Sequence, residues 1–211
     1  MNSIQDNRAR VRAGVVTISL SIAFGLIGSS CSAHRSASDD QNVAGTIAPS
    51  RRMADGRQWM TENLNVNADQ SYCYDDTETN CRRYGRLYTW GSAQRGCRSL
   101  GDGWRLPTDD EWRQMAKHHG GVSADPGDGG KAAYATLLIA GSSGFNAVLG
   151  GGRSHDDGQY ARLEAHGFYW TASEIDSATA PFYNFAKGGQ ALHRQGEGEK
   201  QRAFSVRCVR E

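Results

Sequence analysis

The sequence predicts an α+β domain with two to three short helices, short antiparallel strands and long glycine-rich loops, held together by disulfides. The chain of 211 residues contains 26 glycines but only 4 prolines, and 38% of its residues are hydrophobic. This composition indicates a loop-rich fold whose core depends on aromatic side chains rather than on long aliphatic helices. A strongly marked helix start within residues 106–121 and an even set of cysteines beyond residue 50 complete the prediction.

The N-terminal residues have the pattern of an export signal. Arg8, Arg10 and Arg12 precede an uncharged stretch, residues 13–30, that ends in small residues before Cys31. A basic region, an apolar region and a small-residue cleavage site in this order are typical of a secretory signal peptide. A transmembrane helix needs about 20 strongly apolar residues. Serine, threonine and glycine dilute this stretch, so a retained membrane anchor is the less favoured alternative.

Cys31 follows small residues in the way that the modified cysteine of a bacterial lipoprotein does. We therefore predict that residues 1–30 are a lipoprotein-type signal peptide and that Cys31 carries the lipid. Leu26 and Ile27 lie further from the cysteine than in the usual pattern, so cleavage near Ala33 stays an alternative. The expected location is outside the cytoplasm, as a membrane-anchored lipoprotein in the periplasm or at the cell surface (outer membrane).

Residues 31–50 are small and polar without a period, which predicts a flexible tether. Residues 51–211 then form one domain, because about 160 residues suit a single domain. Beyond residues 1–30 the chain has 21 basic and 22 acidic residues and no clustered basic face. Nucleic-acid binding needs such a face. We expect no nucleic-acid partner, and contact with the membrane only through the N-terminal lipid.

Four cysteines of the domain are predicted to form two structural disulfides. An even number of cysteines in an exported domain favours disulfides, although four cysteines allow three pairings. Cys73 and Cys81 bracket a turn-rich polar loop and are paired locally, which leaves Cys97 for Cys208. A metal or redox site is the alternative, and it would favour a closer spacing such as C-x-x-C, which the chain lacks.

Two elements are predicted in the first half of the domain. The Trp-Met pair at residues 59–60 follows an Asp-Gly turn signal and predicts a short strand. Residues 88–101 predict a helix, with Thr89 as its N-cap and Gly101 as its stop. The helical spacing in that segment places Cys97 on the buried face.

The clearest local signal is the helix start in LPTDDEWRQMAKHHGG. Thr108 as N-cap and Glu111 three residues later form a capping box, so the helix is predicted to begin at Asp109. Acidic residues fill its first turn, and a lysine and two histidines its last, which complements the helix dipole. The side chains predicted to enter the core are Trp112, Met115 and Ala116.

One more helix and several strands are predicted in the second half. Residues 131–140, a short stretch rich in Ala, Leu and Ile before a glycine, predict a third short helix. Aromatic or β-branched runs separated by glycine and polar clusters predict antiparallel strands. These runs cover residues 144–153, 167–174, 181–187 and 203–209. In the last run, Phe204, Val206 and Cys208 are predicted to alternate inward.

Seven segments, in this order and spacing, resemble the Fibrobacter succinogenes major paralogous domain family. They are DGRQWMTENLN, SYCYDDTETNC, YGRLYTW, GWRLPTDDEW, GFNAVLGGGR, FYWTASE and FSVRCV, and the resemblance covers residues 53–211. The family is similar in architecture to C-type lectins and to formylglycine-generating enzymes, which have a comparable RLPT-x-x-E-W helix start. The resemblance implies a C-type-lectin-like fold in an exported, often lipid-anchored domain of undefined biochemical role. In C-type lectins a cysteine of the first helix bonds one of the final strand, which agrees with pairing Cys97 with Cys208.

Loop carboxylates are the candidate metal ligands, because calcium binds carboxylate and amide oxygens. The lectin tripeptides Glu-Pro-Asn, Gln-Pro-Asp and Trp-Asn-Asp are absent. The favoured calcium set is Asp156, Asp157, Glu174 and Asp176, with Asp125 and Asp128 as further loop acids. Scattered loop acids are usually solvated, so calcium is an alternative rather than the favoured interpretation, and no cofactor is predicted. His155 beside two aspartates could bind a transition metal, but a polar surface loop is the favoured interpretation.

No catalytic residues are predicted. Thiol chemistry of the formylglycine-generating type needs free, activated cysteines, and the four domain cysteines have structural partners. A G-x-S-x-G nucleophile motif is missing, and Ser142, Ser143 and Ser173 stand in no readable relation to a histidine. The tryptophans are predicted to fill the core. If a loop aromatic is exposed, we expect Tyr160 or Tyr183.

The function predicted from the sequence is a non-catalytic recognition module of the cell envelope. Loops carried by a rigid scaffold are common binding sites, and we expect loops between residues 121 and 189 to bind a glycan or a protein. The first alternative is a formylglycine-type oxidase or other redox enzyme, which free thiols and copper uptake would favour. The second is a structural envelope protein.

Overall fold

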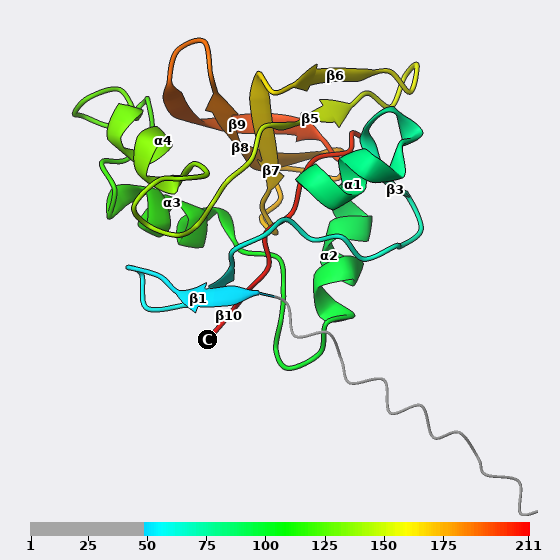
Figure 1. The fold of residues 1–211 in the computed structure, drawn as a ribbon, viewed down its shortest axis with the longest axis horizontal. Coiled ribbons are helices and arrows are strands. Elements are labelled where there is room, and N and C mark those ends of the chain that lie inside the picture. The colour runs from blue at the N-terminus through cyan, green and yellow to red at the C-terminus, as the bar shows by residue number, and fades with distance from the viewer. Residues whose placement is uncertain (1–48) are drawn as a thin grey trace, which may run out of the picture. The chain divides into compact units, whose positions relative to one another are not determined.

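The computed structural model describes residues 49–211, which form four α-helices, one 3₁₀ turn and ten β-strands (Figure 1). The predicted α+β class is confirmed. Residues 1–30, Cys31 and all but the last two residues of the predicted tether lie outside the described residues. None of the described helices combines the length and the apolar character that crossing a membrane requires.

A small sheet joins the two ends of the described chain. β2 (Gln58–Met60) lies between β1 (Ser50–Arg52) and β10 (Val209–Arg210), and both pairings are antiparallel. The strand predicted at residues 59–60 is thus confirmed, and Trp59 is fully buried. The sheet brings the start of the domain beside its end.

The segment between Cys73 and Cys81 was expected to be a loop, and that prediction is wrong. A 3₁₀ turn, η1 (Tyr74–Asp76), leads into α1 (Glu78–Tyr84), which is the fourth helix where two to three were predicted. This helix has seven residues and buries only two of them, Cys81 and Tyr84, so it shows no apolar stripe in the sequence. Tertiary contacts rather than periodicity therefore stabilise it.

α1 is followed by a two-stranded sheet and a second helix. β4 (Leu87–Tyr88) pairs with β3 (Ser71–Tyr72), and α2 (Trp90–Arg98) begins directly after β4. Thr89 occupies the predicted N-cap position of α2, but its side chain makes no capping hydrogen bond. Tyr88, predicted as part of the helix, belongs to the strand.

Both disulfides have the predicted pairing. Cys73 bonds Cys81 across a separation of 8 residues, and Cys97 bonds Cys208 across 111. Cys97 and Cys208 have no exposed area. The longer bond links α2 to the residue just before β10, so it closes nearly the whole domain.

The third helix, α3 (Asp109–Lys117), begins where the capping box predicts. The Thr108 hydroxyl accepts from the backbone N–H of Glu111 at 3.2 Å, and the Glu111 carboxylate accepts from the N–H of Thr108 at 2.8 Å. The three side chains predicted to face the core, Trp112, Met115 and Ala116, have no exposed area. The capping box and the helix face are both confirmed.

The helix predicted from residues 131–140 is present as α4 (Lys131–Leu137). Asp128 caps it, because its carboxylate accepts from the backbone N–H groups of Lys131 at 3.1 Å and Ala132 at 2.6 Å. Ala133 and Leu137 of this helix have no exposed area. α4 therefore covers part of the core with a short apolar face.

A five-stranded sheet forms the second half of the domain, in the order β6-β5-β7-β8-β9 (Figure 1). Its strands are β5 (Gly150–Arg153), β6 (Tyr160–Leu163), β7 (His166–Trp170), β8 (Thr179–Ala186) and β9 (Ala191–Glu199). The pairings are antiparallel except that of β5 with β7, which is parallel. The prediction of antiparallel strands alone is corrected at that position.

The two faces of this sheet differ in what covers them. On one face, side chains of β7, β8 and β9 pack with α3 and α4, and Trp112 stacks on Tyr183 with ring centroids 5.0 Å apart. On the other face, Trp170 packs against Phe204 at 4.5 Å, in a cluster that includes α2 and the long disulfide. The second face remains partly open around Phe168 and Phe182, which are half-buried.

Residues 203–209 do not form the alternating strand that was predicted. Only Val209 and Arg210 pair in a sheet, and every side chain from residue 203 to 209 is buried, Ser205 and Arg207 included. The segment contributes side chains to all three core clusters and forms single bridges to Tyr88, Arg153 and Tyr169. Because it is enclosed on both sides, neither side of it faces solvent.

Candidate functional site

The predicted calcium ligands do not meet in one place. Asp176 accepts from the backbone of Ala178 and Thr179 at 2.8 and 2.7 Å, which fixes a local turn. Glu174 forms an ion pair with Lys200 at 2.6 Å. Asp157 accepts from the backbone of Gln159 at 3.0 Å. Each of these acids has its own protein partner.

The remaining loop acids and His155 also have local partners. Asp125 forms an ion pair with Arg113 at 2.8 Å, and Asp128 caps α4. His155 lies 2.9 Å from Asp156, and its Nδ1 atom lies 3.5 Å from Glu199. The pair of His155 and Asp156 supplies two ligand atoms, and Asp157 does not join them in a three-ligand group.

Within residues 49–211, one group of three acidic, cysteine or histidine side chains brings its ligand atoms within 4.8 Å of one another, and it consists of Cys73, Glu78 and Cys81. Two of its members form a disulfide. A disulfide sulfur is not the thiolate that binds metals. This group is therefore part of a structural crosslink.

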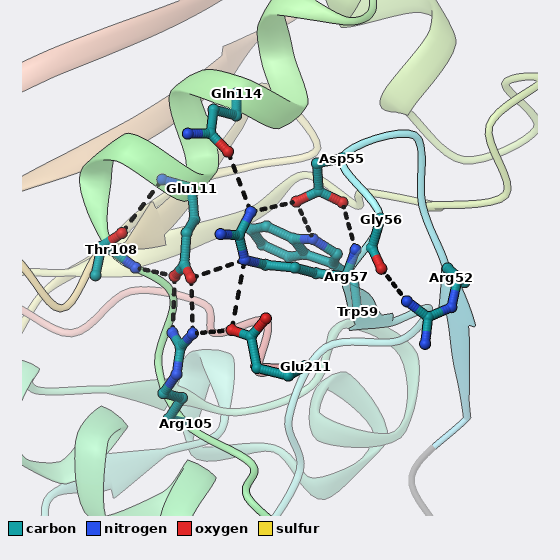
Figure 2. Close-up of polar contacts among 10 residues, drawn as sticks. All are labelled: Arg52, Asp55, Gly56, Arg57, Trp59, Arg105, Thr108, Glu111, Gln114 and Glu211. Carbon is teal, nitrogen blue, oxygen red and sulfur yellow. Dashed lines mark hydrogen bonds and ion pairs between the residues drawn. The ribbon is translucent and has the colours of Figure 1, made fainter.

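The densest polar network surrounds Glu111, which is buried at the start of α3 (Figure 2). Its carboxylate accepts from both terminal nitrogens of Arg105 at 2.7 Å and lies 3.0 Å from Arg57 Nε. The Glu211 side chain bonds Arg105 at 2.9 Å. Figure 2 shows the two guanidinium groups on either side of the Glu111 carboxylate. The network fastens α3 to the turn before β2 and to the end of the chain.

Glu111 is suited to a structural role rather than to proton transfer. Burial alone would raise the pKa of Glu111, but the hydrogen bonds from Arg105 and Thr108 and the charges of Arg105 and Arg57 outweigh burial and hold the pKa below its ordinary value. Its oxygens are occupied by the capping box and the arginines. A general acid would instead need a raised pKa and access to a substrate.

A groove on the partly open face of the five-stranded sheet has the character of a binding site. It consists of two adjoining hollows, of about 360 Å³ and about 240 Å³. We name it the phenyl groove. Both hollows are lined by Phe182, Phe204 and Arg202. The first is also lined by Gly152, Arg153, Ser154, Asp157, Gln159, Ala161, Arg162 and Phe168, and the second by Glu197, Gly198 and Glu199.

Three phenyl rings form the floor of the phenyl groove. Phe204 lies 4.8 Å from Phe182 and 5.1 Å from Phe168, measured between ring centroids. Phe182 and Phe168 are edge to face at 5.9 Å. Such offset and edge arrangements stabilise aromatic clusters beyond the area that they bury. The floor is therefore preformed and apolar.

Glycines beneath the rings make this floor possible. A Cβ atom on Gly152 would lie 3.1 Å from the rings of Phe168 and Phe204. A Cβ atom on Gly198 would lie 2.6 Å from the ring of Phe182 and 2.8 Å from that of Trp170. The rings thus rest directly on the main chain of β5 and β9.

Arg153 stands at the rim of the phenyl groove in a fixed position. Its guanidinium carbon lies 4.2 Å from the ring centroid of Tyr72 and 5.6 Å from that of Tyr160. Its Nη2 atom packs against Gly158, because a Cβ atom added to Gly158 would lie only 2.7 Å from this nitrogen. Its Nε atom is buried and has no hydrogen-bond partner among the described residues. The guanidinium is therefore held by aromatic contacts and not by a carboxylate.

The other side of the rim carries paired charges. Arg202 Nε bonds the Glu199 carboxylate at 2.7 Å, and this hydrogen bond and the charge of Arg202 lower the pKa of Glu199. Beside Arg153, the Tyr160 hydroxyl donates to Asp76 at 2.6 Å, and burial, with this hydrogen bond second, raises the pKa of Tyr160 to about 12. At neutral pH Glu199 is thus charged and Tyr160 is neutral.

Neither the phenyl rings nor the arginines of the phenyl groove were predicted from the sequence as site residues. Tyr160 or Tyr183 was predicted as an exposed aromatic, and Tyr183 is in fact fully buried in β8, where it stacks on Trp112. Tyr160 is half-buried beside Arg153. The glycines at alternate positions 150 and 152 and at 196 and 198 were the available signal. Alternate glycines leave one face of a strand free for large rings.

Residues 121–189 also contain less loop than was expected. α4 and the strands β5, β6, β7 and β8 occupy much of this range. The phenyl groove takes residues from strands and from the turns beside them. Its floor therefore belongs to the rigid part of the domain.

The fold and the groove define a disulfide-linked α+β domain with an aromatic-floored groove on one face of its sheet. The chain belongs to the Fibrobacter succinogenes major domain family, whose model matches residues 50–210. The predicted family is thus confirmed. No curated protein and no solved structure matches the chain.

Proposed function

We propose that this protein is a non-catalytic binding module of the cell envelope, and that the phenyl groove is its binding site for a glycan or a protein. The observation that carries the proposal is the preformed floor of three phenyl rings beside the guanidinium of Arg153, whose Nε atom has no hydrogen-bond partner among the described residues. Ligand sites are usually concave, mostly apolar and equipped with a few fixed polar groups. The phenyl groove combines these properties.

The non-catalytic part of the proposal is supported by the chemistry of the described side chains. Cys73, Cys81, Cys97 and Cys208 are all in disulfides, so a thiol-based oxidase would first have to reduce one of them. The buried acid Glu111 is held by arginines and has a lowered pKa. The alternative enzyme function therefore receives no specific support from these residues.

Export and lipid attachment at Cys31 belong to the same proposal. Two disulfides are typical of proteins in oxidising compartments. The C-type-lectin-like architecture is also proposed. It is supported by the bond from α2 to the residue before β10 and by the pairing of β1 and β10 with the same strand. Metabolic labelling with a radioactive fatty acid, compared between the natural chain and Cys31→Ala, tests the lipid site.

A blocked groove tests the binding function. Ala161 is exposed on β6 and lines the phenyl groove, so Ala161→Trp places an indole over it. Ala135 is exposed on α4, which packs on the opposite face of the sheet, and Ala135→Trp is the matched control. The oxidised protein is screened on a glycan array and against purified envelope proteins. We expect binding that Ala161→Trp abolishes and Ala135→Trp preserves. Ligands that bind both variants equally would overturn the assignment of the groove.

A further inference from the structure

The first hollow of the phenyl groove has an excess of positive charge. Its lining contains Arg153, Arg162 and Arg202 and one carboxylate, Asp157. Arg202 is paired with Glu199 at 2.7 Å. Arg153 and Arg162 make no ion pair with a described residue. Two guanidinium groups without an ion pair thus line one hollow, and Asp157 is the one carboxylate beside them.

The position of Arg153 makes this charge available to a ligand. Tyr72 and Gly158 hold the guanidinium in place, and its Nε atom lacks an acceptor. Because the Nε atom is covered by protein, a ligand can meet the guanidinium only from the hollow that Arg153 lines. A planar guanidinium also offers pairs of N–H groups whose spacing matches a carboxylate or a sulfate. The ligand therefore needs an anionic group.

The floor of the groove indicates what carries the anionic group. Phe168 and Phe182 present half-buried rings, and apolar C–H faces pack on aromatic rings. A pyranose ring has such a C–H face and polar groups around its edge. Ser154, Asp157 and Gln159 line the same hollow and can bond hydroxyl groups. An acidic sugar thus matches both the floor and the rim.

Two other anionic ligands fit less well. A peptide that adds a strand needs a free sheet edge, whereas this groove lies on the face of the sheet. A single-stranded nucleic acid needs a continuous basic track for its phosphates. The second hollow instead carries Glu197 and Glu199, which would repel phosphates.

We propose that the phenyl groove binds an anionic glycan, with a sugar ring on Phe168 and Phe182 and its anionic group on Arg153 and Arg162. This inference rests on the binding function proposed above and adds the class of ligand. The anionic group has two chemical sources, the carboxylate of a uronic acid and a sulfate ester. Both would meet the same guanidinium groups.

Calorimetric titration of the oxidised protein tests the inference. The probes are uronate oligosaccharides of several linkages with their carboxyl-reduced forms, sulfated oligosaccharides with their desulfated forms, and a ten-nucleotide single-stranded DNA. We expect at least one acidic oligosaccharide to bind, and its neutral form to bind at least tenfold more weakly. Binding should weaken further as salt rises, because salt screens exposed charges.

Arginine variants connect the charge to the site. Arg162 is exposed, so Arg162→Gln leaves the floor intact and should weaken binding of the acidic form at least fivefold without changing that of the neutral form. Arg153→Gln should have a larger effect. Arg98→Gln, at the exposed end of α2, is the matched control and should have none.

The outcomes separate the inference from the proposed function. Equal binding of neutral and acidic oligosaccharides, blocked by Ala161→Trp, would overturn the inference and leave the binding function standing. The same holds for a protein ligand blocked by that variant. Stronger binding of the DNA than of every oligosaccharide would also overturn it. If no ligand of any class responds to Ala161→Trp, both fail.

Discussion

The guanidinium of Arg207 is completely buried and donates from Nε to the side-chain oxygen of Asn63 at 2.7 Å. Its terminal nitrogens donate to the carbonyl oxygens of Met60, Phe145 and Asn146. Burial lowers the pKa of Arg207 to about 10, which still leaves it protonated at neutral pH. Arg207 thus joins the end of β2, the segment before β5 and the end of the chain without using an ion pair with a described residue.

Arg207→Met is therefore expected to destabilise the domain by at least about 3 kcal/mol. The substitution leaves several carbonyl groups without donors, and each buried group so orphaned costs about 1–3 kcal/mol. Urea unfolding of the oxidised protein measures the change. Arg82→Met is the control, because Arg82 is exposed and, among the described residues, bonds only Thr79 on its own helix. Equal effects of the two substitutions would show that the buried network contributes little.

The two disulfides should differ in their contribution to stability. In the chain-entropy model, a loop of 111 residues contributes about 5 kcal/mol and one of 8 about 2.5 kcal/mol. We expect the pair Cys97→Ala and Cys208→Ala to lower the free energy of unfolding by about 2 kcal/mol more than the pair Cys73→Ala and Cys81→Ala. Denaturant unfolding of both double variants provides the comparison. The reverse order would contradict the entropic argument.

Acid should weaken the domain through Glu111. The folded state holds the pKa of Glu111 below its ordinary value of 4.5. The stabilisation is therefore fully present above pH 4.5 and is lost as the pH falls through the lower pKa of the folded state. Glu111→Gln should lower stability at pH 7 by about 1–3 kcal/mol, the usual contribution of hydrogen bonds to charged groups.

The same substitution should flatten the dependence of stability on pH in the acid range. Unfolding free energies measured from pH 7 down to pH 3 test this. Glu197→Gln is the matched control, because Glu197 is exposed and makes no ion pair with a described residue. A parallel acid profile for Glu111→Gln and the natural chain would assign the loss to other carboxylates.

The floor of the phenyl groove should tolerate no added methyl group at Gly198. Gly198→Ala places a Cβ atom 2.6 Å from the Phe182 ring, and such overpacking costs about 1–3 kcal/mol. Gly196 lies two residues earlier on β9 and has no atom within 4 Å of the same position. Gly196→Ala should thus be neutral or stabilising by about 0.5 kcal/mol. Thermal unfolding of the two variants measures the difference.

A helix could be predicted from the sequence where its own residues carry a local start signal. Thr108 and Glu111 supply both halves of a capping box, so the start of α3 could be read from four residues. The four cysteines could be paired from their spacing and from the resemblance, which placed Cys97 and Cys208 together. These predictions needed no knowledge of distant contacts.

The parts that were missed depend on contacts far along the chain. α1 has no apolar stripe, and its Cys81 reaches back to Cys73. Arg207 looks like an exposed residue of an alternating strand, and only the carbonyl groups of residues 60, 145 and 146 explain its burial. After Ala191 and Leu192, the strand β9 consists of polar residues and glycine, so its sequence resembles a loop.

The phenyl groove was missed for a related reason. Its floor is formed by rings from β7, β8 and the segment before β10, which meet only when β5 and β9 present glycine beneath them. No short stretch of sequence contains this arrangement. The loop acids, by contrast, were predicted as metal ligands from their residue type alone. In the structure each of them has its own local partner.

The phenyl rings pack directly on the glycine main chain of β5 and β9. The groove therefore has a floor whose residues cannot be exchanged and a rim whose residues can. Any side chain at position 152 or 198 would displace the rings, so the position of the backbone determines the depth of the groove. Arg162, Ala161 and Gln159 are exposed and belong to none of the core clusters. Substitutions at these outer positions should therefore change the lining of the groove without disturbing its floor.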